Sequence, residues 1–95
     1  MTDTTVTDNA DQGRYEVHVD AELAGFIEYT LDGDRIDMTH TEVFEKYRGD
    51  GTAGTLASEA LQDAASRDLT IVPSCPYVAR RLEKHPVPGA RVASA

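Results

Sequence analysis

Residues 47–72 read YRGDGTAGTLASEALQDAASRDLTIV, and this stretch decides the fold. Between Thr52 and Arg67 the apolar residues recur at the three- and four-residue spacing of one helix face. The residues on that face are Ala53, Leu56, Ala57, Ala60, Leu61 and Ala64. Leu69–Val72 follows at once, and its β-branched residues favour a buried strand. The stretch therefore predicts an amphipathic helix over Thr52–Arg67 that leads into a buried strand.

Upstream of this helix, polar and apolar residues alternate with the period of half-buried strands in three segments. These segments are Arg14–Asp20, Leu23–Leu31 and Arg35–Glu42. The turn Asp32-Gly33-Asp34 predicts an antiparallel hairpin, because glycine accepts positive φ and aspartate bonds to nearby backbone. In the third segment Ile36, Met38 and His40 share one face. We therefore expect His40 to continue an apolar face.

Downstream of the buried strand, Pro73 and Pro76 bracket Ser74-Cys75 and end that strand. Tyr77–Lys84 has the composition of a short second helix. The predicted order is β-β-β-α-β-α, an α+β (or α/β layer) fold in which two helices cover a mixed sheet. A right-handed crossover makes the last of these strands parallel to the third.

The length and composition are those of one globular domain. The chain has 95 residues, of which 40% are hydrophobic and 27% are charged. We expect residues 1–13 to be a flexible segment, because they are rich in Thr, Asp and Asn and offer little to bury. Residues 14–86 are expected to form the folded domain, and residues 87–95 a flexible tail.

The charge and the cysteine count limit the partners and the compartment. A formal net charge of −8 opposes binding to nucleic acid or to an anionic membrane, so we expect neither partner. The acidic surface could attract a cationic amine, although keeping the protein in solution is the simpler explanation. No apolar run is long enough to cross a bilayer, no export signal begins the chain, and Cys75 is the single cysteine. We expect a cytoplasmic monomer.

The glycine-rich segment Arg48–Gly54 lies between a strand and the start of the long helix, where backbone N–H groups lack intrahelical partners. Its glycines let the backbone approach a phosphate closely, and the helix dipole favours an anion there. Arg48 adds a full positive charge to a chain whose net charge is negative. The alternative is that Gly49 and Gly51 form a simple turn with Thr52 as the helix cap.

The pattern Arg48-x-x-Gly51-x-Ala53 resembles the R/Q-x-x-G-x-G/A signature of GNAT-type N-acetyltransferases, which also follows a strand and opens a helix. Residues 72–86, VPSCPYVARRLEKHP, resemble the corresponding part of small stand-alone GNAT-like proteins. The resemblance spans Arg14 to Pro86. It implies that the chain binds acetyl-coenzyme A and that its second partner is an amine acceptor.

The resemblance also implies a place for each part of the cofactor. The amides of the glycine-rich segment would hold the pyrophosphate, and the pantetheine would lie between the strands Arg35–Glu42 and Leu69–Val72. Lys84, Arg80 or Lys46 would meet the 3′-phosphate, and the spacing does not select among them. The implied cofactor-binding residues are Thr41, Glu42, Val43, Arg48, Gly49, Asp50, Gly51, Thr52, Ala53, Gly54 and Lys84.

His40, Cys75 and Tyr77 are the candidates for catalysis. His40 has the intrinsic pKa of a general base near neutral pH, or it is a hydrogen-bonded core residue. Cys75 could accept the acetyl group if His40 or the start of the next helix lowers its thiol pKa, or it is a small buried hydrophobe. Tyr77 could protonate a leaving thiolate, or it is a packing residue at a helix start.

The chain departs from larger GNAT enzymes in two respects. Their pattern N-x-x-A-x-x-Y-E-K has Leu82 at its tyrosine position here, so their usual general acid is missing. The N-terminal helices that form much of their acceptor site are also absent, which implies an open site for a flexible or large amine that Glu42 could orient. We predict acetyl-coenzyme A binding with amine N-acetyltransfer and no metal. The alternatives are a non-catalytic acyl-coenzyme A sensor and a plain structural domain.

Overall fold

The structure is a computed structural model that describes residues 3–49 and 51–93. It contains one mixed sheet, two α-helices and two short 3₁₀ helices. In chain order these are β1 (Thr4–Asn9), η1 (Ala10–Gln12), β2 (Arg14–Val19), β3 (Glu22–Asp32), β4 (Arg35–Val43), η2 (Glu45–Tyr47), α1 (Thr52–Ser66), β5 (Thr70–Val72), α2 (Pro76–Lys84) and β6 (Arg91–Val92).

The strands lie in the order β1-β2-β3-β4-β5-β6, and each of the first three neighbouring pairs is antiparallel. β4 and β5 are parallel over Arg35–Asp37 and Thr70–Val72, which confirms the crossover predicted from the sequence. The predicted α+β class with a mixed sheet is also confirmed. Among the described residues, no helix is both long and apolar enough to span a membrane.

Two segments expected to be flexible contain strands. Thr4–Asn9, inside the supposedly flexible residues 1–13, pairs with β2 along its whole length. Its run of threonines and a valine favours strand structure, although composition alone suggested a disordered segment. In the expected tail 87–95, Arg91–Val92 pairs with β5. The other parts of those predictions include residues 1–2 and 94–95, which lie outside the described residues.

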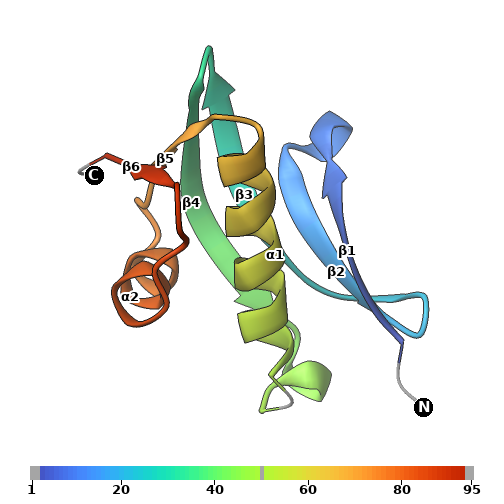
Figure 1. Ribbon diagram of the computed structural model, residues 1–95. Coiled ribbons are helices and arrows are strands. Elements are labelled where there is room, and N and C mark those ends of the chain that lie inside the picture. The colour runs from blue at the N-terminus through green and yellow to red at the C-terminus, as the bar shows by residue number, and fades with distance from the viewer. Residues whose placement is uncertain (1–2, 50, 94–95) are drawn as a thin grey trace.

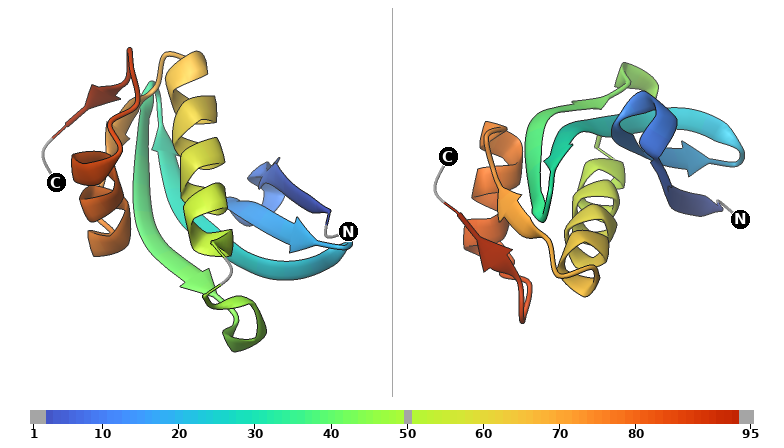
Figure 2. Two further views of the ribbon diagram at one scale, coloured as in Figure 1. Left: turned by 60° about the horizontal axis from the view of Figure 1, so that its bottom comes forward. Right: turned by 90° about the horizontal axis from the view of Figure 1, so that it is seen from above.

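α1 packs across one face of the sheet, and the sheet curves around it (Figures 1 and 2). The helix predicted from the apolar spacing is confirmed, and it ends one residue before the predicted Arg67. Its apolar face is buried against β-strand residues such as Tyr15, Ile27 and Met38, each at most 1% exposed. This packing fixes the position of the helix and therefore of the segment that precedes it.

A β-bulge in β4 reverses the faces of the residues that follow it. Met38 pairs with Tyr29, but His40 pairs with Glu28, so Thr39 is an extra residue on β4. Before the bulge, Met38 points toward α1 and is fully buried. After it, His40 is exposed, contrary to the expectation that it continues the apolar face. The prediction was wrong because simple period-two alternation assumes that no residue is inserted.

β4 and β5 pair over only three residues and then separate. The Cys75 amide still donates to the Met38 carbonyl at 2.9 Å, and α2 begins at Pro76. α2 lies beside the second half of β4, beyond the carboxyl end of β5 (Figure 1). The second helix predicted over Tyr77–Lys84 is thus confirmed, and it starts one residue earlier. The N-terminal ends of α1 and α2 both face the end of β4.

Candidate functional site

A groove of about 430 Å³ lies where the end of β4 meets the N-terminal ends of both α-helices. Three elements and one loop line it. The lining residues are His40, Thr41, Glu42 and Val43 of β4, Arg48 of the loop, Ala53 of α1 and Tyr77 of α2. All seven were predicted as site residues, and the fold brings them together from three separate parts of the chain.

The N-terminal end of α1 is open to this region. Gly51 is the N-cap residue in the left-handed conformation (φ 77°), and none of the described side chains caps the helix. The first bond of the helix runs from the Thr55 amide to the Gly51 carbonyl at 3.0 Å, and the first turn contains no acidic residue. A helix start whose first turn carries no acidic side chain is suited to an anion.

Two glycines keep the space in front of this helix start clear. Gly49 and Gly51 both have positive φ (88° and 77°), and a Cβ atom added at either would meet nothing within 4 Å. The glycines are therefore required by the backbone conformation, and the space beside them is free for a ligand. The predicted residue Asp50, between them, lies outside the described residues. Thr52 is only 6% exposed and does not line the groove.

Arg48 joins the loop to the sheet. Its Nε donates to the carbonyl of Val43 at 3.0 Å, which holds the guanidinium at the end of β4. Within the ranges 3–49 and 51–93, Arg48 makes no ion pair. Its positive charge is thus not neutralised by the described part of the chain. It lies beside the open helix start, where an anion would meet it.

Cys75 is the N-cap residue of α2 and is 5% exposed. Its Sγ lies 3.3 Å from the Thr41 hydroxyl. Burial raises the pKa of the thiol, but hydrogen bonds from this hydroxyl and from the backbone N–H groups of Val78, Tyr77 and Thr41 outweigh burial. The pKa of Cys75 is therefore lower than that of an ordinary cysteine. The Thr41 hydroxyl, which the sequence analysis did not consider, is the largest of these lowering causes, and the start of α2 contributes through Val78 and Tyr77.

His40 and Glu42 form the outer edge of the groove. His40 Nε2 lies 3.5 Å from Glu42 Oε1, and their side chains are 54% and 46% exposed. Thr41, between them in sequence, turns toward Cys75 on the other side of the strand. The groove therefore runs across the edge of β4, with His40 on one side and the helix starts on the other.

The basic residues considered for phosphate binding occupy different places. Lys46 pairs with Glu22 at 3.2 Å, and it does not line the groove. Arg80 and Lys84 line a hollow of about 410 Å³ on α2, together with Tyr77 of the groove. The same hollow is also lined by Arg81.

Arg81 was not singled out in the sequence analysis. Its Nη1 would lie 3.1 Å from a Cβ atom added at Gly54, so its guanidinium rests on the first turn of α1. Gly54 permits this approach because it has no side chain. Arg81 stands four residues after Tyr77, which places both on one face of α2, and this spacing could have identified it.

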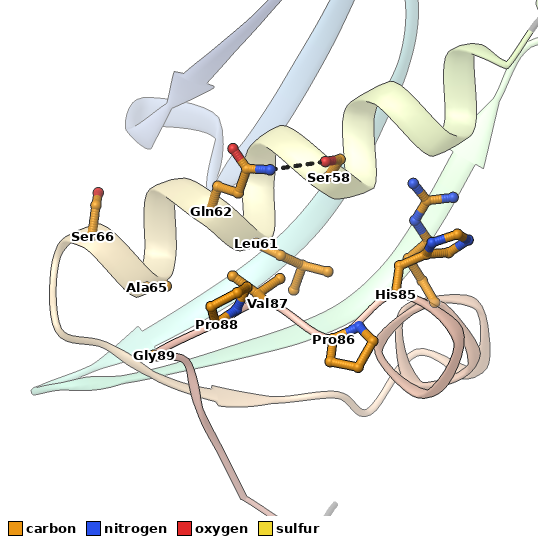
Figure 3. Close-up of a pocket in the computed structure, with 11 residues that line it drawn as sticks. Ser58, Leu61, Gln62, Ala65, Ser66, His85, Pro86, Val87, Pro88 and Gly89 are labelled. Carbon is orange, nitrogen blue, oxygen red and sulfur yellow. Dashed lines mark hydrogen bonds between the residues drawn. The ribbon is translucent and has the colours of Figure 1, made fainter.

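Another hollow, of about 510 Å³, lies farther along the seam between α1 and α2 (Figure 3). Leu61 of α1 and Val87 of the following segment face each other in it, and the Gln62 side chain donates to Ser58 Oγ at 3.2 Å. His85 stands at the end nearer α2. Arg81 lines this hollow and also a second one with Gly51 and Gly54, so its side chain links the hollow of Figure 3 to the start of α1.

No cluster of three or more His, Cys, Asp or Glu residues suited to a metal occurs among the described residues.

Known proteins share both the sequence and the fold. Protein NATD1 of Gallus gallus is 39% identical over 61 residues, which are 63% of this chain and 56% of that protein. Protein NATD1 of Homo sapiens is also 39% identical over 61 residues, which are 54% of its length. The chain thus spans about half the length of the curated relatives it matches.

Two solved structures share the fold. A GCN5-like protein from Staphylococcus aureus superposes with a TM-score of 0.71 at 20% identity, covering 100% of this chain and 93% of that one. The ribosomal-protein-S18-alanine N-acetyltransferase of Escherichia coli gives a TM-score of 0.64 at 11% identity, and the superposition covers 88% of this chain and 76% of that one. The sequence family described as GCN5-related N-acetyl-transferase matches residues 14–91. The chain belongs to this GCN5-related N-acetyltransferase family.

Proposed function

We propose that this protein binds acetyl-coenzyme A at the groove and transfers the acetyl group to an amine. The observation that carries the proposal is the uncapped start of α1, which faces open space beside Gly49 and Gly51. A helix start of this kind is suited to a diphosphate. Membership of the GCN5-related family supports the same ligand.

The fold offers a place for each part of the ligand. The diphosphate would lie on the amides from Gly49 to Gly54, beside the Arg48 guanidinium. The pantetheine arm would follow Thr41–Val43, where β4 has left β5 and the groove is open. The nucleotide end would lie on the seam between the helices, where Arg81 rests on Gly54 and Lys84 is nearby.

Local charge makes this arrangement possible in an acidic protein. The chain carries a net charge of −8, which opposes a ligand with several phosphates. The proposed phosphate positions are, however, next to Arg48, Arg81 and Lys84, and these make no ion pair within the described ranges. These cations offset the long-range repulsion at the place where the phosphates would bind.

His40 and Tyr77 supply the chemistry of the direct transfer. The amine nitrogen forms a bond to the acetyl carbon and gives a proton to His40, which is exposed at the groove edge. The carbon–sulfur bond breaks, and the departing thiolate takes a proton from the Tyr77 hydroxyl, since Tyr77 lines the groove. Cys75 would serve through an acetyl-cysteine intermediate only if Thr41, which separates it from the groove, moved aside.

Binding is tested by titrating acetyl-coenzyme A into labelled protein and following the amide NMR shifts. The proposal expects large shifts at Gly49, Gly51 and Gly54 and small ones at Gly33, which lies at a distant hairpin. An unchanged spectrum at the three loop glycines would refute it and would leave only a structural role for the loop.

Transfer is tested separately from binding. Labelled acetyl-coenzyme A is incubated with a pool of amines and with wild-type, His40→Ala or Cys75→Ala protein. If transfer is direct, His40→Ala should greatly reduce the rate of product formation. Cys75→Ala should reduce that rate only slightly, because the thiol does not line the groove. Binding without any labelled product would instead identify a non-catalytic acyl-coenzyme A sensor.

A further inference from the structure

The face of the sheet that points away from α1 carries two rows of side chains across β2, β3 and β4. One row is Arg14, Glu28 and His40, and the other is Glu16, Phe26 and Glu42, as the strand register shows. Cross-strand neighbours of this kind share one face. We call these six residues the outer patch. No α-helix packs on this side of β2 and β3 in the views of Figure 2.

The outer patch has an aromatic centre. The Phe26 ring is half-buried and stands 6.4 Å from the His40 ring and 6.3 Å from the Phe44 ring. The Arg14 guanidinium already lies over the Phe26 ring at 4.6 Å from its centroid. Arg14 therefore covers one face of the ring, and a partner's aliphatic stem would pack on the part of the half-buried ring that stays exposed.

The charges of the outer patch are not balanced. Glu16 is neutralised by Arg14 at 2.7 Å. Glu28 is exposed and has no ion pair in the described part of the chain, where the one ion-pair partner of Glu42 is His40. The surplus negative charge therefore lies at Glu28 and Glu42, on either side of His40 and Phe26. A cationic partner complements this arrangement.

The outer patch is continuous with the groove, because His40 and Glu42 belong to both. An acceptor lying on the patch would present its amine to His40, while the helix starts lie on the other side of β4. The span from Arg14 to His40 crosses three strands, about 10 Å at the usual strand spacing. That width suits a chain segment better than a single small amine.

We infer that the outer patch docks a basic polypeptide segment whose lysine side chain is the acceptor amine. The lysine stem packs on Phe26, its amine reaches His40, and flanking cations meet Glu28 and Glu42. This inference rests on the proposed function, since it names the acceptor class for the same groove. It assigns Glu28 a positioning role, because Glu28 touches the flanking residues and not the reacting atoms.

The kinetic test uses short peptides with a blocked N-terminus and one lysine, flanked by arginines, serines or glutamates. With acetyl-coenzyme A in excess, the arginine-flanked peptide should have the highest kcat/KM. Glu28→Gln should raise the KM of that peptide roughly threefold without changing kcat, the size expected for an exposed charge pair. Added salt should weaken the preference in wild type and weaken it less in the variant.

Asp32→Asn is the matched control, because it removes one charge from the same strand about 13 Å away by strand rise, beyond the screening length. It should leave the peptide preference unchanged. Equal kcat/KM for the three peptides, or equal effects of Glu28→Gln and Asp32→Asn, would overturn the inference. So would acetylation of spermine with no acetylation of the basic peptide.

A binding test separates this inference from the proposed function. The arginine-flanked peptide is titrated into labelled protein without acetyl-coenzyme A. Amide shifts at Phe26, Glu28 and His40 that the glutamate-flanked peptide does not cause would support the docking surface even if no acetyl group were transferred. No shift at these residues would refute the surface, whereas the shifts of the loop glycines with acetyl-coenzyme A would still test the cofactor site on their own.

Discussion

α1 and α2 begin at the same groove, but their N-terminal ends are occupied differently. The end of α2 is filled by the protein itself, because Cys75, its N-cap residue, is 5% exposed and its Sγ lies 3.3 Å from the Thr41 hydroxyl of β4. The end of α1 follows Gly51 and has no capping side chain and no acidic residue in its first turn. The protein thus stabilises an internal group at one helix start and leaves the other available for a ligand.

The difference shows how one physical property serves two purposes. Both ends carry the partial positive charge of unpaired N–H groups. At α2 that charge lowers the pKa of a buried thiol. At α1 the N-cap residue is Gly51 and not Ser, Thr, Asp or Asn, which costs only a few tenths of a kcal/mol and fits a site kept for an anion. Substitutions that block the start of α1, or that remove a contact at the start of α2, test this interpretation of the two helix starts.

The largest expected effect comes from blocking the start of α1 with Gly51→Val. The new side chain would enter the open space at the proposed diphosphate position, so acetyl-coenzyme A affinity should fall by at least about a hundredfold, measured by calorimetry. Valine in the left-handed conformation should also lower the free energy of unfolding by about 1–2 kcal/mol.

Gly33→Val separates these two effects. Gly33 has a similar φ of 59° and equally open surroundings, but it lies in the hairpin between β3 and β4. It should lower stability by a similar amount and leave affinity unchanged. Equal affinities of the two variants would show that the space beside Gly51 is not part of the ligand site.

Arg81→Gln should have the next largest effect. Removing a guanidinium that rests on the first turn of α1 should weaken acetyl-coenzyme A binding about tenfold, the loss expected for a charge-assisted hydrogen bond. Lys46→Gln is the control, because Lys46 pairs with Glu22 away from the groove. If the two variants bound equally well, the nucleotide end would not lie between the helices.

Thr55→Glu should have a smaller effect, raising the stability of the protein while lowering its affinity for acetyl-coenzyme A. Thr55 is exposed in the first turn of α1, where a carboxylate stabilises the helix by about 0.5 kcal/mol. The same charge should repel the diphosphate and weaken acetyl-coenzyme A binding roughly threefold. Thermal unfolding and calorimetry measure the two effects. A rise in both stability and affinity would contradict an anion site at this helix start.

The sequence predicted those parts of the molecule that depend on local patterns. The apolar spacing of α1 and the glycines before it were sufficient to predict the helix and the loop that precedes it. Helix periodicity and positive φ each favour particular residue types, so both can be read from the sequence. β1 was missed because its exposed threonines resemble the composition of a disordered segment. β6 has only two residues, too few for any periodicity.

The errors at the site come from features that only the folded chain defines. The inserted Thr39 moved His40 to the outer face, and no residue type marks a bulge at that position. Arg81 gained its place from the packing of α2 against Gly54, a contact between residues 27 positions apart. Thr41 was expected near the pantetheine, but its contact with Cys75 required knowing where β4 and β5 separate.

Thr41→Val should have the smallest effect, at the filled start of α2. Losing the hydroxyl removes one group that lowers the Cys75 pKa, while burial and the backbone N–H groups remain. The pKa should therefore rise part of the way toward its ordinary value, so that less thiolate is present at any pH near neutrality. Ultraviolet absorbance of the thiolate against pH measures this, with Cys75→Ala as the blank. An unchanged titration midpoint would contradict a role of the hydroxyl and would leave the backbone N–H groups of Val78, Tyr77 and Thr41 as the groups that lower the thiol pKa.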